Sequence, residues 1–417
     1  MATYNHKLYD LCIIGAGPMG SAAARHATLI EPGLKVCLIG PAEPKSRFAN
    51  CHEMFASHYD EGRVATTFIA DPIWSQLSKR TIDRCRDLER RTGIEFFTDR
   101  DELVIGHKSD PHMKYIYQAA VDMKNKAQIL DRTEVSKQYP FLSVRRKDDS
   151  IIYSKTGGFL SPRKLVLAQC TAAHLQGCDI FNDIVNQVTE LNQSDGSKCM
   201  VVTTANGQKY FARKVLLTPG AFIGFHNLLP PKKELVLTLL KQDLAFVEVG
   251  EKDVSRLKKM PVVIWKDQID NIFCYVLPPI QYPDGKHYIK IGRRTTEELC
   301  TQKEVIDYLQ RDPSEVVADP HLLDLLVELV KDLEVISTHG DSCVTAHTPS
   351  GLLYCDMVTP RLGIAIAGNG AGVTASDEVG NMAARMIISG SWNHDLPREK
   401  FRAKFRVAIK AKISARL

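Results

Sequence analysis

The feature that most constrains the fold is a glycine-rich turn near the start of the chain. Residues 11–14 are apolar and predict a buried parallel strand, and the spacing G-x-G-x-x-G follows at once in Gly15, Gly17 and Gly20. Small residues then open a helix, and residues 35–39 predict a second strand. The first glycine permits a tight turn, the second lets a pyrophosphate approach the backbone, and the third lets the helix pack closely on the strand. The sequence therefore predicts a dinucleotide-binding α/β unit whose helix N-terminus faces the phosphates.

One part of this dinucleotide site is missing. The acid that usually binds the ribose hydroxyls at the end of the second strand is replaced by Gly40 and Pro41. Glu43 lies nearby and is our candidate for that role. The glycines alone do not decide between NAD and FAD, but a second unit for NAD(P)H is absent, since the glycines of residues 368–372 have the wrong spacing.

Composition sets broad limits on the protein. A chain of 417 residues, 44% hydrophobic and 25% charged, is typical of a soluble globular protein of two or three domains. No apolar run is long enough to span a bilayer, and the first ten residues do not resemble a secretory signal, so we expect neither. Eleven cysteines without a C-x-x-C pair indicate a reducing compartment with mostly free thiols, and we expect no metal site.

The charge is concentrated at the end of the chain. Residues 398–417 contain eight Lys or Arg and one acid, so they carry +7 and leave about −2 on the body from a net charge of +5. A near-neutral body argues against nucleic-acid binding. Phe401, Phe405, Ile409 and Ile413 are four residues apart, which predicts a basic terminal helix docked on the body, or alternatively a helix on a membrane surface.

Five later segments resemble, in the same order, parts of a known enzyme family. They are residues 102–106 (ELVIG), 130–142, 156–180, 214–224 (KVLLTPGAFIG) and 363–380 (GIAIAGNGAGVTASDEVG). Together with the glycine-rich unit they resemble the D-amino acid oxidase superfamily of FAD enzymes, and within it the sarcosine oxidase-like branch. The resemblance implies FAD as cofactor and a Rossmann-like FAD-binding domain with an interleaved mixed-sheet α+β substrate domain.

The implied domains are interrupted. The expected FAD-binding parts are residues 1–95, 156–226 and 338–397, the substrate-domain parts are residues 96–155 and 227–337, and residues 398–417 form the basic tail.

The same resemblance suggests catalytic residues. Residues 56–63 (ASHYDEGR) are similar to a Ser-His-x-x-x-Arg loop over the flavin and suggest His58 and Arg63, although a polar surface loop is the alternative. Tyr275 matches an active-site tyrosine, with an ordinary core tyrosine as the alternative. Lys290 lies in an alternating strand, where a lysine usually points to solvent, but it matches the lysine that activates oxygen. A cation there would stabilise developing superoxide.

Two departures from the family affect the substrate. The arginine and lysine that hold a substrate carboxylate in amino-acid oxidases correspond to Thr66 and Thr374, and the expected tyrosine two residues after Cys343 is Thr345. Either Arg63, Arg293 or Arg294 replaces this clamp, or the substrate is not a simple amino acid. Asp60 and Glu61 would favour a cationic amine.

The final segments bear on the flavin itself. Residues 343–349 (CVTAHTP) resemble the segment that carries a covalent cysteine in sarcosine oxidase-like enzymes, which suggests that Cys343 is bonded to FAD. The alternative is a free cysteine. Gly370, Gly372 and Thr374 belong to the last glycine-rich turn and are expected beside the flavin.

These observations predict an FAD-dependent oxidase of a secondary or N-methylated amine. Dioxygen would re-oxidise the flavin to give hydrogen peroxide, and the imine product would hydrolyse to an aldehyde or keto compound. A dehydrogenase with another electron acceptor, or a non-catalytic FAD-stabilised assembly protein, are the alternatives. The ending Ala415-Arg416-Leu417 fits a C-terminal peroxisomal address and suggests the peroxisomal import receptor as a partner, with the cytoplasm as the alternative location.

Overall fold

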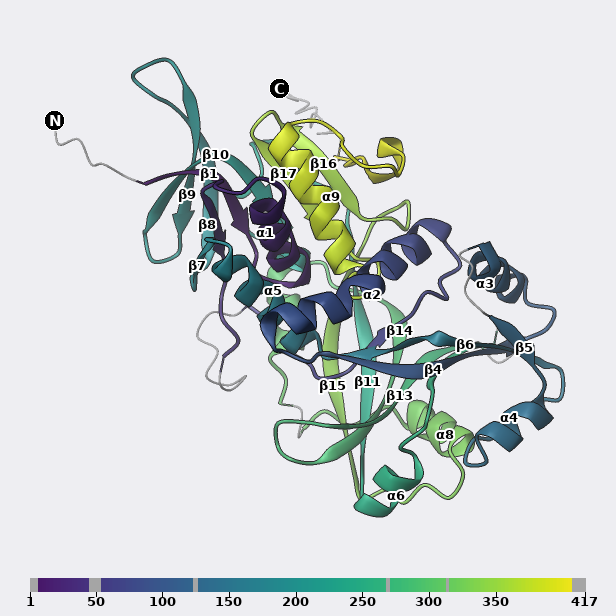
Figure 1. The fold of residues 1–417 in the computed structure, drawn as a ribbon. Helices are drawn as coiled ribbons and strands as arrows, with labels where there is room; N and C mark the ends of the chain where they lie inside the picture. Colours follow the sequence, from purple (N-terminus) through teal and green to yellow (C-terminus); the bar gives the residue numbers. More distant parts are fainter. Residues whose placement is uncertain (1–6, 45–53, 123–126, 268–270, 313–314, 407–417) are drawn as a thin grey trace, which may run out of the picture.

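Two sheets from interleaved parts of the chain form the protein (Figure 1). The structure is a computed structural model and describes residues 7–44, 54–122, 127–267, 271–312 and 315–406. The smaller sheet contains the first strands of the chain and the larger sheet contains β4 and most of its middle section. This arrangement confirms the expected α/β domain with an interleaved mixed-sheet domain.

The smaller sheet is built on the predicted β-α-β unit. Its parallel strands are β17 (Leu362–Ile366), β10 (Lys209–Leu217), β1 (Leu8–Ile14), β2 (Val36–Ile39) and β7 (Asp179–Phe181), side by side in that order. β16 (Tyr354–Thr359) extends it antiparallel to β17, and β8 (Val185–Asn192) and β9 (Lys198–Thr204) form a hairpin on β10. β1, β2 and β17 are apolar because both faces of this sheet are covered.

Four helices pack beside the smaller sheet: α1 (Pro18–Ile30), α2 (Pro72–Thr92), α5 (Pro162–Leu175) and α9 (Ser376–Ser389). α1 and α9 lie side by side (Figure 1). Their backbones approach closely at Gly380, where an added Cβ would lie 2.5 Å from the Cβ of Ala22. The side chain of Asp71 accepts hydrogen bonds from the backbone N–H groups of Ile73 and Trp74 and begins α2.

The larger sheet is mixed. Its strands run β15 (Ser337–His347), β11 (Thr238–Val249), β14 (His287–Glu298), β13 (Ile272–Gln281), β12 (Val262–Asp267), β4 (Phe97–His107), β6 (Asp149–Leu160) and β3 (Arg63–Ala65), with β5 (Gln128–Leu130) beside β6. Only the β12–β4 pair is parallel among the pairs of this sheet that the structure describes. Its helices are α3 (Pro111–Asp122), α4 (Arg132–Gln138), α6 (Glu251–Arg256), α7 (Gln302–Leu309) and α8 (Pro320–Leu329).

Strand pairing differs from the expected domain segments at three strands. β3, inside the expected FAD-binding segment 1–95, pairs with β6 in the larger sheet, and β6 itself continues to Leu160. β15 pairs along β11 from Ser337 to His347, so the chain returns to the smaller sheet only with β16. The sequence alone does not show where the chain passes from one sheet to the other, because a strand with alternating polar and apolar residues fits either sheet.

The expected basic helix at residues 398–417 is wrong for the part that the structure describes. Residues 398–401 form a 3₁₀ turn, and the ring of Phe401 is buried and stacks on Trp392 at 5.3 Å. The chain then runs extended, and Phe405 forms a β-bridge with Leu235. Backbone hydrogen bonds to this neighbouring segment replace the intrahelical ones, which are marginal in a short helix. Residues 407–417, with Ile409, Ile413 and the final tripeptide, lie outside the described residues.

Among the helices that the structure describes, none is both long and apolar enough to cross a lipid bilayer.

Candidate active site

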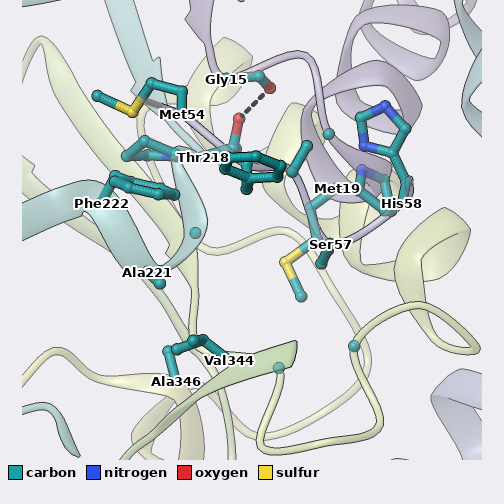
Figure 2. A pocket seen from close by; sticks show the side chains of 18 of the residues that line it. Gly15, Met19, Met54, Ser57, His58, Thr218, Ala221, Phe222, Val344 and Ala346 are labelled. Carbon is teal, nitrogen blue, oxygen red and sulfur yellow. Dashed lines mark hydrogen bonds between the residues drawn. The ribbon is translucent and has the colours of Figure 1, made fainter. Parts of the chain in front are cut away.

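A cavity of about 1810 Å³, part of it open to solvent, lies between the two sheets. One wall is the carboxyl edge of the smaller sheet, and the opposite wall is β15 of the larger sheet. Figure 2 shows Gly15 and Thr218, joined by a hydrogen bond, on one side and Val344 and Ala346 of β15 on the other. A crevice at the carboxyl edge of a parallel sheet is the place where α/β proteins of this kind bind dinucleotides.

The glycine-rich turn fits the pyrophosphate of a dinucleotide. Gly15 has φ +105°, and a Cβ there would lie 2.5 Å from the carbonyl oxygen of Thr218. At Gly20 a Cβ would lie 1.8 Å from the carbonyl oxygen of Gly15, so this glycine is needed for helix packing and not for the cavity wall. At Gly17 a Cβ would meet nothing within 4 Å, because the open space of the cavity begins there. Pro18 is the first residue of α1. Among the described residues no side chain caps the N–H groups at the start of this helix, which leaves them for phosphate oxygens.

Alanine at Gly17 is expected to abolish flavin binding while leaving the fold intact. Its φ of −80° suits any residue, so the methyl group would strain nothing but would occupy the space of the pyrophosphate. We expect the flavin content of purified Gly17→Ala to fall by about tenfold or more, as for the loss of charge-assisted hydrogen bonds. The melting temperature of the flavin-free protein should match that of flavin-free wild type. Gly20→Ala is the contrasting variant, expected to melt far lower; equal flavin content in Gly17→Ala and wild type would contradict the assignment.

Two of the expected catalytic residues, Lys290 and Arg63, contact one carboxylate, that of the largely buried Asp60. It accepts hydrogen bonds from the ammonium of Lys290, from Nη2 of Arg63 at 3.1 Å and from the hydroxyl of Tyr282 at 3.0 Å. Lys290 is 1% exposed and also donates to the carbonyl oxygen of Gly62 at 3.1 Å. Asp60 and Arg63 line the cavity, whereas Lys290 lies behind Asp60. Two cations and one anion leave a net charge of about +1 at this wall.

These charges persist at neutral pH. Burial raises the pKa of Asp60, but Lys290 and Arg63 lower it more, so the pKa lies well below its usual range. Burial lowers the pKa of Lys290, but Asp60 raises it above its ordinary value. The carboxylate is therefore ionised and the ammonium is protonated across the pH range in which enzymes normally work.

Two nitrogen atoms on the cavity wall lack partners among the described residues: Nδ1 of His58 and Nε of Arg63. Burial, Arg163 and Arg63 lower the pKa of His58 to about 3, so its imidazole is neutral at pH 7. An unpartnered buried donor is costly, so these atoms are available for a ligand. His58 and Arg63 therefore both lie on the cavity wall.

Four other expected site residues lie outside the cavity wall. Tyr275 is packed in the sheet on Gly292, near Lys290 and Arg63. Arg294 is exposed, with its guanidinium 6.0 Å from the centre of the Phe273 ring.

The remaining two, Glu43 and Thr374, are engaged by other groups. Both carboxylate oxygens of Glu43 accept from Arg163, at 2.6 and 2.7 Å, and Arg163 also pairs with Glu61. The hydroxyl of Thr374 donates to the carbonyl oxygen of Val64 at 2.7 Å.

The structure gives a second reason to doubt a carboxylate clamp at Thr66 and Thr374. The hydroxyl of Thr66 accepts a hydrogen bond from the backbone N–H of Phe68 at 2.8 Å. Beside it lies Glu102, fully buried, whose pKa is raised to about 8 by burial. The sequence analysis did not identify Glu102, although an acid at the start of the apolar segment ELVIG was a signal for it. It also did not identify the contacts of Asp60 with Lys290 and Arg63.

Cys343 lies on the cavity wall. Of the ten cysteines that the structure describes, it alone lines the cavity, from β15, where it is half-buried. It packs on Leu244 and Tyr275. Burial lowers the pKa of the neighbouring Arg63, but Asp60 and the Cys343 thiol raise it above its ordinary value, which places the thiol beside the guanidinium. Gly370 and Gly372 line the cavity as well.

Within the described part of the chain, no three His, Cys, Asp or Glu side chains are grouped so as to hold a metal ion.

Comparisons with known proteins agree with this geometry. The chain is 25% identical over 400 residues to monomeric sarcosine oxidase of Streptomyces avermitilis, covering 93% of this chain and 96% of that one. It is 25% identical over 237 residues to N-methyl-L-tryptophan oxidase of Yersinia pestis, covering 55% and 56%. The solved structure of fructosyl peptide oxidase from E. terrenum shares the fold, with a TM-score of 0.72, 17% identity and coverage of 96% and 93%. The family model described as "FAD dependent oxidoreductase" matches residues 10–386, and the chain belongs to that family.

Proposed function

We propose that the protein is a flavin-dependent oxidase of a secondary or N-substituted amine. The observation that carries this proposal is the pair of cations, half-buried Arg63 and fully buried Lys290, which share one carboxylate beside a dinucleotide cavity. A net positive charge at that place favours anionic charge that develops during electron transfer to dioxygen. The names of similar proteins, monomeric sarcosine oxidase and N-methyl-L-tryptophan oxidase, point to the same substrate class.

When bound, FAD would supply the redox chemistry: two electrons and two protons leave the amine as it becomes an imine, and the same two electrons and two protons convert dioxygen to hydrogen peroxide. The chain supplies position and charge. The neutral imidazole of His58 and the free Nε–H of Arg63 orient the substrate at the wall. Lys290, held by Asp60, keeps its charge in a water-poor surrounding, where its field is strongest.

The substrate carries at most one anionic group near the flavin. Arg63 lines the cavity, whereas the two threonines at the clamp positions bind backbone groups and Glu102 lies beside one of them. Among the described residues that line the cavity, Arg63 is the one lysine or arginine, so a dicarboxylate would meet no second such cation on that part of the wall. We therefore favour N-substituted amines with one carboxylate or none.

The purified protein is expected to be yellow and to form hydrogen peroxide with some members of a panel of N-methyl amines and N-methyl amino acids. The measurement is an absorbance spectrum followed by a coupled peroxidase assay under air. A colourless protein that binds NAD would overturn the proposal. Flavin reduction without peroxide, but with turnover of an artificial electron acceptor, would indicate the dehydrogenase alternative. Bound FAD that no amine reduces would indicate the assembly protein.

We also propose a peroxisomal location. The final tripeptide Ala-Arg-Leu has the small-basic-Leu pattern that the import receptor recognises, and a peroxide-forming oxidase belongs with catalase. A fluorescent protein fused in front of the chain is expected to collect in peroxisomes, and deletion of Leu417 should release it to the cytosol. A full-length fusion that stays diffuse would refute the location.

A further inference from the structure

The place of the missing ribose acid is filled from a neighbouring strand. β2 and β7 are parallel, with Ile39 opposite Phe181, so their carboxyl ends meet at one edge of the smaller sheet. Asp183 follows β7 by two residues and lines the same cavity as Gly40 and Pro41, which follow β2. An acid that follows β7 therefore lies near the part of the cavity where an acid at the end of β2 would bind the ribose.

The alternative acid is already engaged. Glu43 forms a two-bond ion pair with Arg163 and does not line the cavity. Asp183 is half-buried, and one oxygen, Oδ1, accepts from the backbone N–H of Ile184 at 2.7 Å and from Nδ2 of Asn206 at 3.1 Å. These bonds fix the carboxylate, and its other oxygen has no hydrogen-bond partner among the described residues.

A second polar group lies on the same wall. His226 follows the 3₁₀ turn at residues 220–224 and lines the cavity, and its Nε2 is buried without a partner among the described residues. The backbone of the next residue, Asn227, is hydrogen-bonded to the start of β8. Its N–H donates to the carbonyl oxygen of Asn186 and its carbonyl oxygen accepts from the N–H of Val188, each at 3.0 Å, which holds the backbone beside His226 in place. Burial lowers the pKa of His226, so its imidazole is neutral and adds no charge beside Asp183.

We propose that Asp183 and His226 bind the adenosine half of FAD, with Asp183 accepting hydrogen bonds from the ribose hydroxyls in place of an acid at the end of β2. A carboxylate is the usual partner of these hydroxyls, and His226 supplies a hydrogen bond to a neighbouring oxygen of the same half. The proposal rests on FAD binding by the family and not on amine oxidation, so it survives if no amine is a substrate.

The test uses the full chain prepared from flavin-starved cells and titrated by calorimetry with ADP, 2′-deoxy-ADP and 3′-deoxy-ADP. Wild type is expected to prefer ADP over at least one deoxy compound by about tenfold, as for one hydrogen bond to a charged group. Asp183→Asn should remove that preference, whereas Glu43→Gln should retain it. If Asp183→Asn retains the preference, or if Glu43→Gln removes it, the assignment to Asp183 is wrong.

His226 is tested by its Nε2. His226→Leu keeps the volume and should weaken ADP binding by about fivefold or more, and His226→Gln, which restores a polar group at that place, should recover most of it. Circular dichroism and melting of the ligand-free variants separate lost binding from lost folding. A folded His226→Leu that binds ADP like wild type would remove His226 from the site.

Discussion

Acid-precipitated protein is expected to give a yellow pellet, with FAD mass on the peptide that contains Cys343. The bond would join the Cys343 sulfur to the 8-methyl carbon of the flavin; the thiol proton and a methyl proton leave, and dioxygen removes the two electrons released. The structure supports this expectation because Cys343 alone of the described cysteines lines the cavity, beside the Arg63 guanidinium.

The effect is all-or-none, which makes the control simple. Cys343→Ser should release all of its flavin to the acid supernatant, while Cys300→Ser, which changes an exposed cysteine outside the cavity, should leave the pellet yellow. Flavin found entirely in the supernatant of wild type would show that Cys343 is a contact residue and not an attachment site.

The second large effect is expected for Lys290→Met. Re-oxidation of the reduced flavin by air should slow by a factor on the order of 10²–10³, because one preorganised charge is lost. Reduction by substrate should change far less. The net charge of the Asp60–Arg63–Lys290 group would fall to zero, and Arg63 would remain to pair with Asp60, so the buried carboxylate keeps a partner. Stopped-flow absorbance at the flavin band separates the two half-reactions.

Lys286→Met is the matched control. Lys286 lies in the turn just before β14, the strand that carries Lys290. It is exposed and pairs with Glu248 outside the cavity, so its loss should leave both half-reactions unchanged. If Lys290→Met binds flavin normally and its reduced flavin is re-oxidised as fast as in wild type, Lys290 has no role in the reaction with dioxygen. Arg63 would then be the cation that acts in that reaction.

Local patterns predicted the parts of the fold that depend on neighbouring residues. The strand, glycine-rich turn and helix at residues 8–30 could be predicted because the apolar run, the glycine spacing and the small residues that follow all lie within one short segment. His58, Arg63 and Cys343 were found from short motifs, and the structure brings all three to one cavity. Tyr275 and Arg294 came from the same reasoning, but strand alternation does not reveal how far a side chain lies from a cavity.

Other expectations failed where distant segments decide the outcome. Phe401 and Phe405 have helical spacing, yet Trp392 and Leu235 offer a stacking partner and a β-bridge, which outweigh a short helix. β15 was assigned to the wrong sheet because its partner, β11, lies about a hundred residues earlier in the chain.

Residues within a few positions of one another were enough to predict the dinucleotide turn and the candidate cysteine, and the order of five short segments along the chain indicated the cofactor family. Only the tertiary structure decided which charges meet. Asp60 and Lys290 are 230 positions apart, and Asp183 stands beside the end of β2 only because β7 pairs with that strand. The ion pair keeps Asp60 and Lys290 charged although burial alone would favour their neutral forms, whereas burial keeps the imidazole of His58 neutral. These protonation states depend on contacts between segments far apart in the chain, which local sequence patterns do not show.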